Sequence, residues 1–152
     1  MRLFQHLRPE LVLIAPPARH RDELFRLFAD AFAGADLVRS ADEVVSRLLG
    51  REAILSTAIG GGVAVPHAQI PGLGRLAMAA SIHPEGLPYP ALDEKPVHLV
   101  FCLLGDTTTT ADHLAGLARL ARLARSRTVL EQLVQTRTGD EFIATLARLE
   151  GE

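Results

Sequence analysis

A histidine closely follows a segment whose residues could bind an anion. Ser56 and Thr57 supply hydroxyl donors, and Arg51 supplies a planar guanidinium that suits two-point contact with a phosphate. His67 follows, and a neutral imidazole is a competent nucleophile near neutral pH. Three consecutive glycines stand between them, namely Gly60, Gly61 and Gly62. Because glycine takes positive φ at no steric cost, their N–H groups could turn toward one point. The segment thus predicts a cradle for phosphate oxygens beside the imidazole.

His67 has two possible explanations. Out of context, a histidine after proline at a strand end is usually an ordinary surface or half-buried residue. Here Pro66 lacks an N–H and fits most easily where strand pairing stops, so the ring would project from a strand end within reach of another protein. The glycines also favour function, since each costs conformational entropy that a simple turn does not require. We therefore expect His67 to be a phosphoryl acceptor.

The segment resembles the active-site motif of a known family. It is similar to the pattern R-E-x-x-x-S-T-x-I-G-x-G-[IV]-A-[IV]-P-H-[GA] of the fructose/mannitol-type enzyme IIA proteins of the bacterial phosphoenolpyruvate-dependent sugar phosphotransferase system, which include the nitrogen-regulatory IIA proteins. The matching residues are Arg51, Glu52, Ser56, Thr57, Ile59, Gly60, Gly62, Val63, Ala64, Val65, Pro66, His67 and Ala68. The resemblance implies an α/β sandwich, and it implies that His67 accepts a phosphoryl group.

A second stretch extends the resemblance over most of the chain, from about residue 11 to residue 149. The segment Tyr89–Leu104, and His113 at the start of a leucine-rich helix, are similar to the family's latter half. The resemblance implies that His113 is the second active-site histidine, which would orient the reacting ring or stabilise charge on the transferred group. From the residues alone, the simpler explanation of His113 is a hydrogen bond within the helix cap formed by Thr107–Thr110.

The implied chemistry is an in-line phosphoryl relay between proteins. The expected donor is phosphorylated HPr or a paralogue, and the expected acceptor is an enzyme IIB or a regulatory target. The candidates to hold the phosphoryl oxygens are Arg51, Ser56, Thr57, Gly60, Gly61, Gly62 and His113. No nucleotide, metal or other cofactor is expected, because the donor already carries a high-energy phosphoramidate.

Three functions of different kinds remain open on the sequence. The first is a phosphocarrier of a sugar uptake system. The second is a regulatory module that changes partners with the phosphorylation state of His67. The third is a metal-independent hydrolase that reuses the glycine cradle, and the lack of an evident general-base triad disfavours it. The sequence does not separate the first two.

The bulk properties agree with one cytoplasmic domain spanning residues 1–152. The length fits a single domain with a real core. The formal net charge of −2 offers no basic footprint for nucleic acid, and one cysteine fits a reducing compartment. The apolar runs are far too short for membrane insertion. The histidines also lack the spacing of a zinc site, so no metal is expected.

Two helices and four strands are expected to position these residues in the first two thirds of the chain. Apolar residues at helical spacing predict a helix over Arg21–Ala33. Ser40 and Glu43 form a capping box, so a second helix begins near Ala41 and carries Arg51 at or just past its end. The expected strands are Leu11–Ala15, Val63–Pro66, Leu76–Ile82 and Val97–Leu104.

The last third of the chain is expected to be helical. An apolar stripe predicts a helix from about Asp112 to Arg125. Capping boxes at Thr128 with Glu131 and at Thr138 with Glu141 predict two short closing helices. The resulting β-α-α-β-β-β-α-α-α order predicts an α/β fold with a single mixed sheet flanked by helices.

Overall fold

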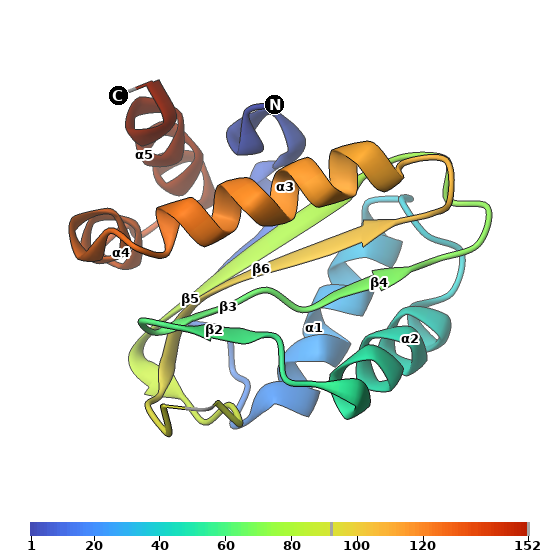
Figure 1. The fold of residues 1–152 in the computed structure, drawn as a ribbon, viewed down its shortest axis with the longest axis horizontal. Helices are drawn as coiled ribbons and strands as arrows, with labels where there is room; N and C mark the ends of the chain where they lie inside the picture. The colour runs from blue at the N-terminus through green and yellow to red at the C-terminus, as the bar shows by residue number, and fades with distance from the viewer. Residues whose placement is uncertain (92, 152) are drawn as a thin grey trace.

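The computed structural model describes residues 1–91 and 93–151, and it contains one mixed sheet with helices on both faces (Figure 1). The strand order is β1-β5-β6-β3-β2, and β4 also pairs with β6. The strands are β1 (Val12–Ile14), β2 (Ala58–Gly60), β3 (Val63–Ala64), β4 (His67–Gln69), β5 (Ala77–Leu87) and β6 (Val97–Gly105). The predicted fold class is confirmed.

The helices form two layers around this sheet (Figure 1). The first two are α1 (Arg21–Gly34) and α2 (Ala41–Ile54), and the last three are α3 (Thr110–Leu123), α4 (Arg127–Val134) and α5 (Gly139–Gly151). Two short 3-10 turns, Leu3–His6 and Pro9–Leu11, precede β1. The α1–α2 pair covers one face of the sheet, and α3, α4 and α5 cover the other.

Strand β6 runs through the middle of the core and is buried on both faces. Val100, Cys102 and Leu104 pack in the cluster under α1 and α2, whereas Leu99, Phe101 and Leu103 pack in the cluster under the last three helices. This alternation follows from the two-residue repeat of a strand. Cys102 is fully buried, and burial raises the pKa of its thiol.

Two predicted strands are wrong in extent. The strand expected over Leu76–Ile82 is longer in the structure, where β5 runs on to Leu87. The expected strand Val63–Pro66 divides into β3 and β4, which pair with β6 at two successive places, Val63 beside Leu99 and His67 beside Leu103. Pro66 cannot donate a hydrogen bond, so the ladder is interrupted there, although its carbonyl accepts one from Leu103 N at 3.0 Å. As a result His67 begins a new strand and does not project from the end of the previous one.

The three glycines build a hairpin, and this explains strand β2, which the sequence did not predict. Gly60 of β2 pairs with Val63 of β3, and only Gly61 and Gly62 join them. The two turn residues have φ of 65° and 83°, the left-handed geometry that a two-residue type I′ hairpin turn requires. Gly60 has φ of 86° at an irregularity in the strand register. The glycine run therefore has a structural cause.

Most predicted helix starts are confirmed. Ser40 Oγ accepts from Glu43 N at 3.1 Å, and Thr138 Oγ1 accepts from Glu141 N at 3.0 Å. The capping box predicted at Thr128 and Glu131 is wrong, because Ser126 Oγ caps α4 by accepting from Val129 N at 3.3 Å. Helix α3 begins two residues earlier than predicted, and His113 lies in its first turn as expected.

Candidate functional site

His67 presents a free ring nitrogen. Its Nδ1 lies 2.7 Å from the carbonyl oxygen of Val65, so an Nδ1–H group donates to that oxygen and the lone pair of Nε2 is left available. The ring is half-buried. Burial lowers the pKa of His67, and the neighbouring Arg51 guanidinium lowers it further. The neutral, nucleophilic ring therefore predominates near neutral pH.

His113 faces His67 from the first turn of α3. The two ring centroids are 5.4 Å apart, and the planes meet edge to face at 74°. Burial lowers the pKa of His113, and the neighbouring His67 lowers it further. Gly105, the last residue of β6, leaves room for this ring, since a Cβ there would lie 3.0 Å from His113 Nδ1. The structure thus brings the two histidines together.

The loop that leads from β6 into α3 is closed by Asp106. One carboxylate oxygen accepts from the N–H and hydroxyl of Thr108 at 2.8 and 2.6 Å, and the other accepts from Gly74 N at 2.5 Å. The Thr108 hydroxyl is the main reason that the pKa of Asp106 is lowered. Asp106 N in turn donates to Thr109 Oγ1 at 2.9 Å. These contacts close the loop without the His113 ring, which remains available to face His67.

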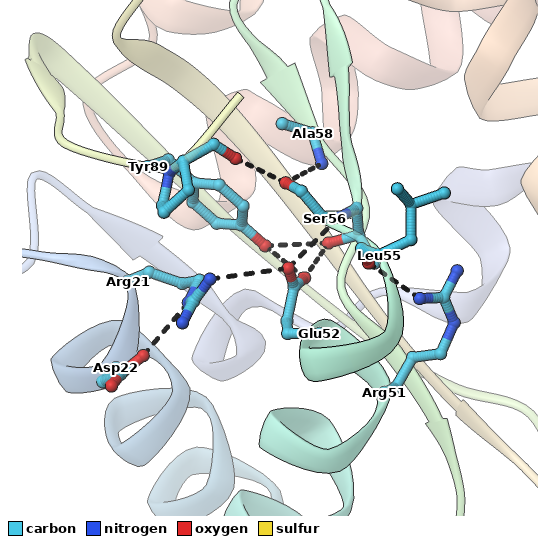
Figure 2. A network of polar contacts seen from close by, with 10 residues as sticks. Arg21, Asp22, Arg51, Glu52, Leu55, Ser56, Ala58 and Tyr89 are labelled. Atoms are coloured by element: carbon cyan, nitrogen blue, oxygen red, sulfur yellow. Dashed lines mark hydrogen bonds and ion pairs between the residues drawn. The ribbon is translucent and has the colours of Figure 1, made fainter. Parts of the chain in front are cut away.

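Arg51 borders the His67 ring from the last turn of α2, as predicted. Its Nη1 donates to the carbonyl oxygen of Leu55 at 2.8 Å, which leaves the other guanidinium N–H groups for a ligand (Figure 2). Two hollows meet at Arg51 and His67. The first hollow, about 540 Å³, is also lined by His113, and the second, about 590 Å³, is also lined by Ser56. A phosphoryl group on His67 would have a guanidinium beside it.

Ser56 and Thr57 line the second hollow, but their hydroxyls already have partners. Ser56 Oγ donates to the carbonyl oxygen of Pro90 at 2.5 Å. Thr57 is buried, and its hydroxyl donates to the Glu52 carboxylate beside the phenol of Tyr89 (Figure 2). In this structure the Thr57 hydroxyl is therefore not available for the phosphate contact predicted for it, because its proton is used by Glu52. Both residues shape the wall of the hollow.

The glycines lie away from His67. Gly61 and Gly62 line a different depression, the hairpin hollow, together with Lys95, His98 and Arg127. At the rise of an extended chain, the five residues from Gly62 to His67 span on the order of 15 Å. The structure therefore does not bring the predicted glycine cradle beside His67. What lies beside Gly62 is His98, whose Cδ2 atom would be 3.5 Å from an added Cβ.

Sequence reasoning missed several residues at the site. Arg47 and Gln69 line the first hollow, and Glu52 with Tyr89 supports the second. Arg47 precedes Arg51 by one helical turn, so its place on the same face of α2 could have been inferred from the 3.6-residue repeat. No local signal pairs Glu52 with Tyr89, which lies far along the chain.

Exposed apolar side chains surround the two hollows. Leu55 and Ile59 beside the second hollow are 62% and 46% exposed, and Leu114 beside the first is 61% exposed. Ile54 at the end of α2 is 80% exposed. Apolar groups gathered around a reactive ring are typical of a surface that another protein covers.

Residues 1–91 and 93–151 also bear on two other kinds of site, a metal site and a membrane span. No three histidine, cysteine, aspartate or glutamate side chains gather there in a way that could hold a metal ion. Within the same ranges, no helix has both the length and the apolar character that crossing a membrane requires.

Comparison with known proteins identifies the family of this mixed α/β sandwich. The family profile described as "Phosphoenolpyruvate-dependent sugar phosphotransferase system, EIIA 2" matches residues 5–149. The chain belongs to this family, as the resemblance in the motif implied.

Relatives of two kinds are similar to this chain. A nitrogen regulatory protein of Bradyrhizobium diazoefficiens is 37% identical over 100 residues, which span 66% of this chain and 65% of the relative. A fructose-specific EIIA component of Haloferax volcanii is 28% identical over 92% of this chain and 91% of its own length. Among solved structures, the nitrogen regulatory protein IIA-Ntr of Neisseria meningitidis superposes with a TM-score of 0.87 at 27% identity, covering 95% of this chain and 98% of its own.

Proposed function

We propose that this chain is a phosphocarrier that accepts a phosphoryl group on Nε2 of His67. The observation that carries the proposal is the state of that ring, whose Nδ1–H is held by the Val65 carbonyl while burial keeps it neutral. A second imidazole and a guanidinium stand around it, and both belong to the kinds of group that stabilise a phosphoryl group in transfer. The protein thus acts as a transferase component with a phosphohistidine intermediate.

The phosphoryl transfer requires no proton to move between donor and acceptor. The Nε2 lone pair of His67 attacks the phosphorus of a donor phosphohistidine and forms the new P–N bond, while the donor nitrogen keeps the electron pair of the bond that breaks. The His67 ring, still carrying its Nδ1–H, becomes cationic in the product. The contact with the Val65 carbonyl oxygen at 2.7 Å then becomes a charge-assisted hydrogen bond and stabilises that product.

Arg51 and His113 hold the phosphoryl oxygens in this proposal. Arg51 lines both hollows, so its guanidinium can follow the group as it moves onto His67. His113 meets the ring edge to face and can donate a hydrogen bond to an oxygen or fix the orientation of the ring. Ser56 shapes the wall of the second hollow beside them, because its hydroxyl donates to the Pro90 carbonyl oxygen.

The partners are other proteins in the cytoplasm. Phosphorylated HPr or a paralogue is the donor, and the exposed apolar side chains around the hollows provide its docking surface. The acceptor is an enzyme IIB or a regulatory target. One solved neighbour of the same fold is a complex of enzyme IIA mannitol with phosphorylated enzyme IIB from Escherichia coli, which supports an acceptor of that kind. The chemistry needs no metal or cofactor.

A regulatory role is the second candidate, in which the phosphorylation state of His67 controls binding to a partner. It is favoured by the comparisons with nitrogen regulatory proteins, since IIA-Ntr of Neisseria meningitidis superposes with a TM-score of 0.87, against 0.76 for IIA mannitol of Escherichia coli. Transfer of the phosphoryl group to an enzyme IIB supports the transport role. A protein that binds one phosphorylation state and receives no phosphate supports the regulatory role.

Intact-mass spectrometry after incubation with phosphorylated HPr tests the proposal. We expect one acid-labile phosphate on the wild type and none on His67→Ala. The matched control is His20→Ala, which changes an exposed histidine just before α1 and should take up one phosphate as the wild type does. A wild-type chain that stays unmodified beside a competent donor would disprove the proposal.

A further inference from the structure

A buried carboxylate links two segments that border the second hollow (Figure 2). Glu52 follows Arg51 in α2, and its side chain is 1% exposed. It accepts hydrogen bonds from the N–H of Thr57 at 3.1 Å and from the phenol of Tyr89 at 2.7 Å, and also one from the Thr57 hydroxyl. A carboxylate removed from water needs such partners, so this one is firmly held in place.

The far side of the carboxylate is balanced by Arg21. Its Nη1 lies 3.8 Å from Glu52 Oε2, and its guanidinium carbon lies 5.9 Å from the centre of the Tyr89 ring (Figure 2). The Tyr89 ring also meets Phe25 edge to face, with centroids 6.4 Å apart. Burial raises the pKa of the Tyr89 phenol, so the group remains a hydrogen-bond donor. The charge of Glu52 is thus compensated from within the fold.

Both linked segments touch the site. The first is the turn Leu55–Thr57, whose Leu55 carbonyl oxygen accepts the hydrogen bond from Arg51. The second is the strap Tyr89–Ala91, whose Pro90 carbonyl oxygen accepts from Ser56 Oγ at 2.5 Å. Residues of both segments line the second hollow. Glu52 and the bond from Ser56 to Pro90 therefore both join the anchor of Arg51 to the opposite wall.

We propose that Glu52 is a positioning residue for phosphoryl transfer, whose carboxylate clamps the turn Leu55–Thr57 to the strap Tyr89–Ala91. The clamp holds the guanidinium of Arg51 and the wall of the second hollow in place before a donor docks. Reacting groups that are fixed in advance need no ordering at the moment of transfer. The inference rests on the proposed function of His67, and Glu52 acts only through its neighbours.

Amide hydrogen exchange tests the clamp without using phosphoryl transfer. Tyr89→Phe removes the phenol's bonds to Glu52 and to the Thr57 hydroxyl, and leaves the bonds from Thr57 to Glu52 in place. If the carboxylate joins the two segments, the Thr57 amide should exchange about tenfold faster in this variant. The control is Val44→Ala, which opens a cavity on the same buried face of α2 but about two helical turns before Glu52. This variant should lower the free energy of unfolding of the whole chain, and the Thr57 amide should not exchange selectively faster than other amides.

Transfer kinetics then separate positioning from general stability. Thr57→Val removes the hydroxyl bond to Glu52, so Arg51 loses a fixed anchor and kcat with phosphorylated HPr should fall roughly tenfold. Thr57→Ser keeps a hydroxyl and should restore kcat. Tyr89→Phe loosens mainly the strap Tyr89–Ala91, which forms the wall of the second hollow. It should therefore raise KM for phosphorylated HPr about threefold with little change in kcat. Val44→Ala should leave both constants near their wild-type values.

The possible failures are distinct. A wild type that takes up no phosphate would refute the proposed function, while hydrogen exchange would still decide whether the clamp exists. A wild type that transfers phosphate, together with Tyr89→Phe and Thr57→Val variants that match it in exchange, kcat and KM, would overturn the clamp. The test of the clamp rests on the Tyr89 and Thr57 variants. Its outcome therefore stands even where a Glu52→Gln protein does not fold.

Discussion

Two hollows of this molecule each contain a histidine with the same local arrangement. His67 Nδ1 lies 2.7 Å from the Val65 carbonyl oxygen, and His98 Nδ1 lies 2.8 Å from the His83 carbonyl oxygen. Both rings therefore have a free Nε2, and both have cationic side chains in the same hollow. The local arrangement of a histidine is thus not sufficient to define the site.

The hollows differ in what surrounds the ring. At His67, three elements converge, namely the end of α2, the start of β4 and the start of α3, and together they add a second imidazole and an arginine. In the hairpin hollow, Arg127 is paired with Glu131 at 3.2 Å, and the glycines serve a turn. The comparison shows that convergence of elements distinguishes the site, whereas glycine content does not.

The largest expected difference between the two hollows comes from removing the second imidazole, that of His113. His113→Ala should slow phosphorylation of His67 by roughly 10²-fold, because a group that orients the ring or stabilises transferred charge is lost. Rapid-quench kinetics with phosphorylated HPr would measure the rate. His98→Ala, the matched change in the hairpin hollow, should leave the rate unchanged. Equal slowing in both variants would mean that the two hollows do not differ in the way described.

Sequence reasoning succeeded where function depends on elements that can each be predicted locally. The helix that carries Arg51 and the first turn that carries His113 follow from apolar spacing and caps, and the resemblance singled out two histidines that the structure places face to face. It failed where one pattern has two physical causes. Positive φ at Gly61 and Gly62 suits an anion cradle and a type I′ turn equally, and only the pairing of Gly60 with Val63 distinguishes them.

Long-range partners were the other cause of failure. The Thr57 hydroxyl looked free for a phosphate because its partners Glu52 and Tyr89 could not be paired from the sequence. Tyr89 is 32 residues further along the chain and reaches Thr57 only through the folded strap. A hydroxyl in a motif therefore indicates a ligand contact only after the buried groups around it are known.

A pair of glycine substitutions sharpens the comparison by separating activity from stability. In Gly105→Ala, the new Cβ would lie 2.8 Å from Thr109 Oγ1 and 3.0 Å from His113 Nδ1, so the second imidazole must shift. We expect transfer to slow about tenfold and stability to fall by about 1–3 kcal/mol. In Gly62→Ala, the nearest atoms are 3.5 Å away, so the cost is mainly the positive φ of 83°, about 1–2 kcal/mol.

Thermal or urea unfolding and transfer rates would measure the two effects. The Gly62→Ala protein should transfer at the wild-type rate at a temperature where it is folded, because its glycine lies in the hairpin hollow. Slower transfer in folded Gly62→Ala would mean that the glycines act in phosphoryl transfer at His67, and it would contradict the hairpin explanation.

The last expected effect concerns the titration of the rings. Burial lowers the pKa of His67 below 6.5, and it lowers that of His83, in the strand behind the hairpin hollow, to about 4. The unfolded chain binds protons at these histidines before the folded one does. Stability is therefore complete above about pH 6.5 and is lost as pH falls through the folded pKa values, for His83 between about 6.5 and 4. Urea unfolding at several pH values would check this sign.

Arg51→Gln should shift one of these titrations and leave the other unchanged. The charged groups acting on the His67 ring are Arg51, which lowers its pKa, and Glu52, which raises it, while His113 faces it as a second ring. Removing the guanidinium should therefore raise the pKa of His67, and the pKa of His83 should not move, since burial and His98 determine it. Imidazole proton NMR would follow both rings. A rise at both histidines would point to a general loosening of the fold, and no rise at His67 would mean that Arg51 does not act on the reacting ring.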